Sequence, residues 1–290
     1  MKPPRFEYFA PRSLEEALGL LAQCGERAKI LAGGQSLIPL LNFRLIQPEV
    51  LIDIGRLREL DYIRGSDGGM AIGALTRQHA VECSDAMRSS LPIVAEACRQ
   101  IGHLPIRHRG TIGGNLAHAD PASELPAVML ALDGQFALAG QSGRRTVPAS
   151  QFFTGALTTA LRPGELLVEI RARSLPPRSG SAFLEIARRK GDYALAGAAV
   201  VITCDGTGRC QDARIALCAV GATPVRAREA ERALVGETPR GEIFGEAAER
   251  VAAAIDPPGD IHASAHFRRK LAQYCTRRAI EVAAQRVGGA

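Results

Sequence analysis

Hydrophobic and polar positions change their period along the 290-residue chain, and these changes predict a series of helices and strands. The segment 13–16 (SLEE) has the pattern of a helix capping box, and apolar residues follow it at helical spacing up to Gly25. The run 62–74 alternates around Asp67-Gly68-Gly69, which is typical of a β-hairpin. Further helices are predicted at 35–43, 91–101 and 121–132, and further strands at 6–8, 29–32, 50–54, 135–139 and 166–172. The intervening segment 101–115 (IGHLPIRHRGTIGGN) is interpreted as a turn-rich loop.

A break in the pattern at Ser174–Gly180 (SLPPRSG) predicts a domain boundary, because two prolines and small polar residues interrupt the regular elements. At roughly 150 residues per domain, the chain length also favours two domains. We therefore predict a first domain at 1–177 and a second at 178–290. The second domain shows three strand patterns followed by two helix patterns, at 181–189, 194–204, 212–222, 241–254 and 265–285. This order predicts an α+β fold with a three-stranded antiparallel sheet and helices on one face.

Composition and charge exclude several classes of protein. Hydrophobic residues make up 46% and charged residues 23% of the chain, which is ordinary for a folded globular protein. The formal net charge is +6, but the chain has no lysine-rich run and no basic stretch interleaved with aromatic residues. We therefore do not expect nucleic-acid binding.

Seven cysteines are scattered without a CxxC pair, so neither a disulfide framework nor a zinc or iron–sulfur site is expected. Three histidines near the second of the loops described below, His103, His108 and His118, have no metal-ligand spacing either. Reduced thiols favour a cytoplasmic protein. The first residues lack the apolar core of a signal peptide, and the longest uncharged stretch, 146–161, is too short and too polar to span a membrane.

Two segments with paired glycines, 32–36 (AGGQS) and 111–115 (TIGGN), carry the candidate chemistry. Glycine lets backbone approach a ligand closely, and exposed N–H groups bind anions. A charge-assisted hydrogen bond contributes about 1.5 to 3 kcal/mol, against about 0.3 to 1 kcal/mol from a helix dipole. Two such loops together predict a clamp for a diphosphate. Neither matches GxGxxG or a P-loop, and a single Gly-Gly pair is more often only a tight turn.

Three longer segments resemble one family. These are 32–45 (AGGQSLIPLLNFRL), 107–126 (RHRGTIGGNLAHADPASELP) and 187–197 (ARRKGDYALAG). They are similar to the FAD-binding medium subunit of molybdenum hydroxylases, the family of the carbon monoxide dehydrogenase medium chain and of subunit M of xanthine dehydrogenases. The resemblance extends over the whole chain. It implies a two-part FAD-binding domain of the vanillyl-alcohol oxidase type, followed by the smaller domain.

The resemblance also implies which residues bind FAD. The first loop would contact the pyrophosphate and ribityl region from one side and the second loop from the other, while three apolar residues would face the adenine. Ser123 and Glu124 would bind sugar hydroxyls, with Asp120 as the competing carboxylate. The implied cofactor-binding residues are Leu31, Ala32, Gly33, Gly34, Gln35, Ser36, Leu37, Ile101, Thr111, Gly113, Gly114, Asn115, His118, Asp120, Ser123, Glu124, Leu166, Leu167, Lys190 and Tyr193. No catalytic side chain and no metal ligand is implied.

Tyr193 and Lys190 would lie beside the flavin ring. A phenol can stack on the ring, and the lysine would supply positive charge to a reduced flavin. Apart from the resemblance, Tyr193 is interpreted more readily as a strand tyrosine packed at the domain interface, and Lys190 as a solvated lysine. Gln35 stands where some relatives have histidine, which keeps hydrogen bonding but loses a titratable ring.

The implied function is electron transfer within a heterotrimer that usually dimerises. A small partner subunit would carry two [2Fe–2S] clusters and a large one the molybdenum–pterin cofactor. Electrons would reach FAD on this chain and leave to NAD, a quinone or another acceptor. Two alternatives stay open: a free-standing flavin oxidase or reductase of the same fold, and a cofactor-free binding or assembly module.

Overall fold

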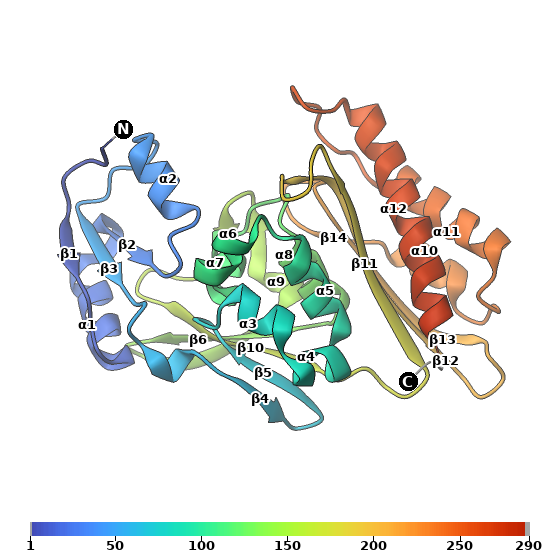
Figure 1. The fold of residues 1–290 in the computed structure, drawn as a ribbon, viewed down its shortest axis with the longest axis horizontal. Coiled ribbons are helices and arrows are strands. Elements are labelled where there is room, and N and C mark those ends of the chain that lie inside the picture. Colours follow the sequence, from blue (N-terminus) through green and yellow to red (C-terminus); the bar gives the residue numbers. More distant parts are fainter. Residues whose placement is uncertain (1, 288–290) are drawn as a thin grey trace.

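A computed structural model describes residues 2–287, and its elements form three successive lobes (Figure 1). The N-terminal lobe contains a parallel sheet in the order β1-β3-β2, flanked by two helices. Its elements are β1 (Glu7–Phe9), α1 (Leu14–Cys24), β2 (Ala28–Leu31), α2 (Leu37–Asn42) and β3 (Val50–Asp53). The predicted capping box is confirmed in part, because the Ser13 hydroxyl accepts the Glu16 N–H at 3.1 Å. The Glu16 carboxylate accepts the N–H of Arg12, rather than that of Ser13, at 2.7 Å.

The middle lobe is built on a five-stranded antiparallel sheet in the order β4-β5-β10-β6-β7. The strands are β4 (Ile63–Ser66), β5 (Gly69–Gly73), β6 (Gln135–Gly140), β7 (Gly143–Pro148) and β10 (Leu166–Arg173). The helices are α3 (Gln78–Cys83), α4 (Asp85–Ser90), α5 (Pro92–Gln100), α6 (Leu104–Arg109), α7 (Ile112–His118), α8 (Glu124–Ala131) and α9 (Ala149–Phe152). A separate two-stranded ribbon consists of β8 (Phe153–Gly155) and β9 (Thr158–Thr159). The predicted hairpin around Asp67-Gly68 is confirmed as β4 and β5.

The C-terminal lobe contains an antiparallel sheet and three helices. Its elements are β11 (Ser179–Ala187), β12 (Ala194–Cys204), β13 (Cys210–Cys218), β14 (Val225–Arg226), α10 (Arg228–Leu234), α11 (Gly241–Ala254) and α12 (Ala265–Arg286). The three predicted strands are confirmed, and the two-residue β14 adds a fourth at the edge next to β13.

The C-terminal sheet is buried on both faces, which explains why all eleven residues of β12 are buried. Side chains alternate along each strand between the two faces. Phe183, Ala199 and Val201 share a core with α5 and α8 of the middle lobe, whereas Ala198 and Val200 pack with the C-terminal helices. The sheet therefore joins the lobe that follows Ser174–Gly180 to the lobe that precedes it.

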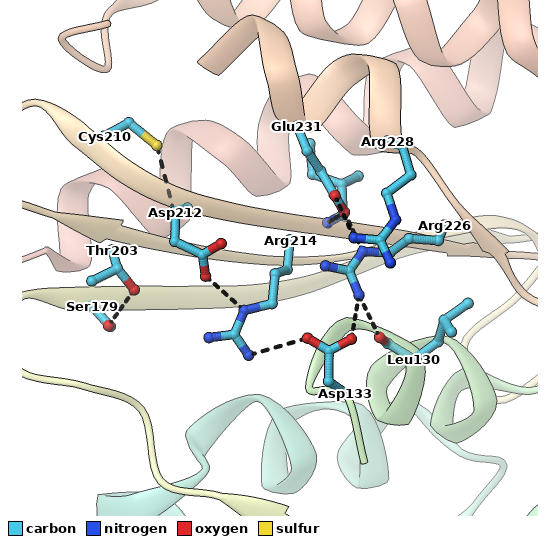
Figure 2. A network of polar contacts seen from close by, with 11 residues as sticks. Leu130, Asp133, Ser179, Thr203, Cys210, Asp212, Arg214, Arg226, Arg228 and Glu231 are labelled. Atoms are coloured by element: carbon cyan, nitrogen blue, oxygen red, sulfur yellow. Dashed lines mark hydrogen bonds and ion pairs between the residues drawn. The ribbon is translucent and has the colours of Figure 1, made fainter. Parts of the chain in front are cut away.

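Polar contacts reinforce this junction (Figure 2). Arg226 of β14 donates to the Leu130 carbonyl at the end of α8 at 2.9 Å and to Asp133 at 2.8 Å, and it also pairs with Glu231 of α10. Near the other end of α8, the N–H of Ala219 donates to the Pro121 carbonyl at 2.8 Å. Both ends of α8 are thus fixed to the C-terminal lobe.

Two predictions were wrong in detail, and several short elements were not predicted. The segment 101–115 contains α6 and the start of α7 rather than a loop, because Pro105 occupies the first turn of α6 and Thr111 caps α7. The predicted helix at 121–132 begins only at Glu124. Short elements were also missed, namely α3, α4, α9, α10, β7, β8, β9 and β14. Within residues 2–287, no helix is both long and apolar enough to cross a membrane.

Candidate functional site

A cleft of about 1020 Å³ lies between the N-terminal and middle lobes. This volume is at the upper end of the range for small-molecule and cofactor sites. Eighteen of the twenty predicted residues line it: Ala32, Gly33, Gly34, Gln35, Ser36, Leu37, Ile101, Thr111, Gly113, Gly114, Asn115, His118, Asp120, Ser123, Glu124, Leu166, Leu167 and Tyr193. A second groove of about 1080 Å³, between α1 and the edge of the middle sheet, is lined by none of the twenty.

The two remaining predicted residues do not line the cleft. Leu31 ends β2 and packs behind the first loop, where its Cδ1 lies 3.2 Å from the position of a Cβ added to Gly34. Lys190 is exposed, in the turn that leads from β11 to β12. The structure therefore gives neither side chain a place in the cavity itself.

The first glycine loop, residues 32–36, follows β2 directly and leads into α2. Gly34 has a φ of 75°, a left-handed conformation that favours glycine. Gly33 packs on the backbone of the neighbouring segment, so that an added Cβ would overlap the Arg109 carbonyl oxygen and lie 2.8 Å from the Gly110 Cα. Among the described residues, the N–H groups from Gly33 to Leu37 donate no hydrogen bond. Five backbone donors are thus free to bind an anionic group in the cleft.

The second loop differs from the first in its hydrogen bonds. The N–H of Ile112 donates to the Thr76 carbonyl at 3.0 Å, and that of Gly113 to the Ala74 carbonyl at 2.8 Å. The N–H of Gly114 donates to the Thr111 hydroxyl at 3.0 Å. The expectation that both loops expose several N–H groups is therefore wrong for the second loop. The N–H groups of Ile112, Gly113 and Gly114 are thus already hydrogen-bonded, whereas those of the first loop are free.

The glycines of the second loop serve packing. A Cβ on Gly113 would lie 2.6 Å from the Ala74 carbonyl oxygen, so this helix start can approach β5 only with glycine there. A Cβ on Gly114 would lie 2.7 Å from the Thr111 hydroxyl and 3.7 Å from the Ala32 Cβ, on the side that faces the first loop.

Thr111→Ala is expected to lower the free energy of unfolding by about 1 kcal/mol, because it removes the N-cap of α7. FAD affinity should fall by less than about threefold, since the capped N–H is not one of the five free donors. Thr111→Ser, which keeps the hydroxyl, is the matched control. Denaturant unfolding and FAD titration of the three proteins check both values. A loss of FAD affinity well above about threefold in Thr111→Ala, but not in Thr111→Ser, would show that the second loop contributes to binding the diphosphate.

A polar cluster of Asn115, Ser123 and Glu124 lines part of the cleft. The Ser123 hydroxyl donates to the Asn115 side-chain oxygen at 2.8 Å, and Glu124 lies next to it with only 6% of its surface exposed. Burial, followed by the nearby Glu185 carboxyl, raises the pKa of Glu124 to about 8. Burial therefore favours the protonated form of Glu124, which can both donate to and accept from sugar hydroxyls. Asp120 also lines the cleft, and its carboxylate already accepts the Ala122 N–H at 2.9 Å.

Several lining residues were not anticipated from the sequence. They form an apolar wall and a rim: Leu40, Ile46, Ile54, Leu75, Gln78, Ile106, Gly110, Leu157, Leu161, Arg162, Pro163, Gly164, Glu165, Gly191 and Asp192. Leu40, Gly110, Gly191 and Asp192 lie within the three segments that carry the resemblance, but none was singled out. The rim includes a turn at Pro163-Gly164. The position of this turn is fixed by Glu165, which accepts hydrogen bonds from Arg145 at 2.7 Å and from the Arg162 N–H at 2.8 Å. Arg145 holds the pKa of this carboxyl below its ordinary value.

Tyr193 stands at the edge of the cleft nearest the C-terminal lobe, with 64% of its surface exposed. The interpretation of Tyr193 as a tyrosine packed in the domain interface is therefore wrong. Its backbone is held by Gly191, which has a φ of 86° and leaves room for the His103 ring, since an added Cβ would lie 2.6 Å from His103 Cε1. The phenol is thus available to a ligand in the cleft or to a second protein.

Both parts of the chain match known domain families. Residues 4–172 match the family described as the FAD-binding domain in molybdopterin dehydrogenase, and residues 181–283 match the CO dehydrogenase flavoprotein C-terminal domain. The 6-hydroxypseudooxynicotine dehydrogenase complex subunit alpha of Paenarthrobacter nicotinovorans is 44% identical, over 99% of this chain and 97% of the relative. The carbon monoxide dehydrogenase medium chain of Hydrogenophaga pseudoflava is 40% identical, over 98% of both chains. A solved carbon monoxide dehydrogenase from the same organism superposes with a TM-score of 0.96 at 42% identity, covering 99% of this chain and 100% of the other.

The residues present fit FAD. The five free N–H groups suit its diphosphate, the cluster of Asn115, Ser123 and Glu124 suits its sugar hydroxyls, and the apolar wall suits its flat rings.

Proposed function

Because the chain belongs to the family of FAD-binding domains in molybdopterin dehydrogenases, we propose that it is the electron-transfer subunit of such a complex. It receives electrons from the [2Fe–2S] clusters of a partner subunit and passes them to an external acceptor. The observation that carries this proposal is a cleft whose free N–H groups fit the FAD diphosphate and whose far edge opens beside the exposed Tyr193.

Each part of the cleft has a task in this function. The N–H groups from Gly33 to Leu37 bind the diphosphate and fix the cofactor along the cleft. Ser123 and Glu124 orient the hydroxylated chain. Bound FAD supplies a redox centre that exchanges electrons singly or in pairs. The protein also holds the reactive edge of the flavin ring near Tyr193, where a partner can approach within electron-transfer range.

The partners of the proposed complex are a small subunit with two [2Fe–2S] clusters and a large subunit with the molybdenum–pterin cofactor. Together they form a heterotrimer that dimerises, and the acceptor is NAD or a quinone. We place the complex in the cytoplasm. All seven cysteines are free thiols and six are buried, which suits a reducing compartment.

The purified chain is expected to bind one FAD and to be reduced by its [2Fe–2S] partner. Mixing the FAD-loaded chain anaerobically with the pre-reduced small subunit should bleach the flavin absorbance. Small organic substrates alone should leave the absorbance unchanged. Stopped-flow absorbance measures both, and a Gly33→Ala chain mixed with FAD and the same partner is the control for reduction of unbound flavin.

Two outcomes favour the alternatives. Turnover of a small organic substrate by the isolated chain would support a free-standing oxidase or reductase. A colourless chain that ignores added FAD would support the cofactor-free module.

A further inference from the structure

One buried polar side chain in the wall of the cleft lacks a hydrogen-bond partner within the protein. Gln78 is the first residue of α3, only 3% of its surface is exposed, and it lines the cleft. Its Oε1 atom is buried and makes no hydrogen bond among residues 2–287. A buried amide oxygen without a partner lowers stability, and such atoms are uncommon in folded proteins. The Gln78 amide can therefore bind a ligand without giving up a bond of this oxygen.

The backbone of Gln78 is fixed, and the end of its side chain is not. The N–H of Gln78 donates to the Gly110 carbonyl at 2.9 Å. A Cβ on Gly110 would lie 2.6 Å from the Gln78 Oε1 atom and 3.0 Å from the Ile106 carbonyl oxygen, so glycine at 110 leaves the space that the amide occupies. Because Oε1 has no bond that holds it in one orientation, the amide can turn about its last side-chain bond. It can thus present its oxygen or its NH2 group.

The wall that carries Gln78 reaches the first glycine loop on one side. Gly110 contacts Gln78 through its carbonyl and its Cα, and the same residue contacts the loop, since a Cβ on Gly33 would lie 2.8 Å from the Gly110 Cα. Gln78 and the start of the loop are therefore separated by a single residue of the wall.

The same wall continues toward Tyr193. A Cβ on Gly102 would lie 2.9 Å from the Ile106 Cδ1, and a Cβ on Gly191 would lie 2.9 Å from the Gly102 carbonyl oxygen. Gly191 stands two residues before Tyr193, and all of these residues line the cleft. Gln78 therefore belongs to the stretch of wall that joins the first glycine loop to the edge beside Tyr193.

We propose that the Gln78 amide is a cofactor-binding group that hydrogen-bonds a hydroxyl of the FAD ribityl chain. The inference rests on the proposed function, since FAD must occupy this cleft with its diphosphate on the first loop and its ring beside Tyr193. The ribityl chain joins these two parts of FAD, so it passes the wall where Gln78 lies. A hydroxyl both donates and accepts, so it pairs with either end of the amide. Ionised phosphate oxygens only accept, so the diphosphate cannot satisfy the amide oxygen.

The test compares FAD affinity and apo stability in Gln78→Met, which has a side chain of similar length without an amide. The dissociation constant of FAD should rise about three- to tenfold, the effect of losing one hydrogen bond. The Tm of the apo chain should be equal or higher, because an apolar group replaces a buried polar atom that has no partner. An amide that stabilised the fold would instead lower the Tm when removed. Gln78→Leu, a second apolar variant, should show the same two results.

ADP locates the contact along the cofactor, because it carries the adenosine and the diphosphate but no ribityl chain. Its dissociation constant, measured by displacement of FAD, should be the same for the unmodified chain and Gln78→Met. Gln141→Met, the same substitution at an exposed position between β6 and β7, is the matched control. It should change neither the two dissociation constants nor the Tm.

Two results would overturn this proposal while the proposed function stands. One is an FAD affinity that stays within about twofold of the unmodified chain in both apolar variants. The other is a lower Tm together with weaker binding of both FAD and ADP, which would assign Gln78 a role in the fold alone. Absence of FAD binding by the unmodified chain would overturn the proposed function itself, so the two failures are distinguishable.

Discussion

Gly33→Ala is expected to weaken FAD binding at least about 100-fold. The added Cβ would overlap the Arg109 carbonyl oxygen and crowd the Gly110 Cα, both of which are backbone atoms that cannot rotate away. The first loop would have to shift, and losing two charge-assisted hydrogen bonds at about 1.5 kcal/mol each corresponds to about 100-fold in affinity. The larger side chain in Gly33→Val should have at least the same effect. Titration of the apo chain with FAD, followed by flavin fluorescence, measures the change.

Two glycine variants serve as comparisons. Gly19 lies in α1 with nothing within 4 Å of an added Cβ, so Gly19→Ala should keep full FAD affinity. Gly114→Ala meets the Thr111 hydroxyl, a side chain that can rotate, and should have an intermediate effect. The Gly33→Ala chain should still melt cooperatively, because Gly33 and Arg109 lie outside the three hydrophobic cores. Unchanged FAD affinity in Gly33→Ala would remove the first loop from the site.

Arg226→Ala is expected to lower the free energy of unfolding by about 3 to 5 kcal/mol. Arg226 pairs with Glu231, which is only 6% exposed, and it also satisfies the Leu130 carbonyl and Asp133 (Figure 2). Removing the guanidinium leaves the buried Glu231 carboxylate with only the exposed Arg228, at 3.6 Å, as counter-charge. It also leaves the Leu130 carbonyl at the end of α8 without its donor from the C-terminal lobe.

Arg232→Ala is the matched control for this prediction. Arg232 pairs with Glu229 on the same helix, both side chains are exposed, and its loss should cost less than about 1 kcal/mol. Denaturant unfolding of both variants measures the difference. A cost below about 1 kcal/mol for Arg226→Ala would mean that the network in Figure 2 does not hold the lobes together.

Sequence patterns predicted the elements that are long or carry a local signal. The helix N-cap at Ser13, the hairpin at Asp67-Gly68 and the long α12 depend on neighbouring residues, and each is present. The segment around α6 was misjudged because a six-residue helix has too few positions for a period, and Pro105 suggested a turn. Short helices of this kind are stabilised by tertiary packing.

The candidate site, too, could be predicted from the sequence only in part. Motif resemblance placed eighteen residues in one cleft, although they come from separate parts of the chain. The resemblance did not distinguish the two glycine loops. The N–H groups of the second loop donate to the carbonyls of Ala74 and Thr76, which are distant from the loop in sequence.

The structure of this chain with FAD bound tests the central claim most directly. We predict that the diphosphate oxygens lie within hydrogen-bond distance of the N–H groups of Gly33 to Leu37, while the N–H groups of Gly113 and Gly114 keep their bonds to Ala74 and Thr111. A diphosphate seated on the N-terminus of α7, or FAD bound outside the cleft, would contradict this account.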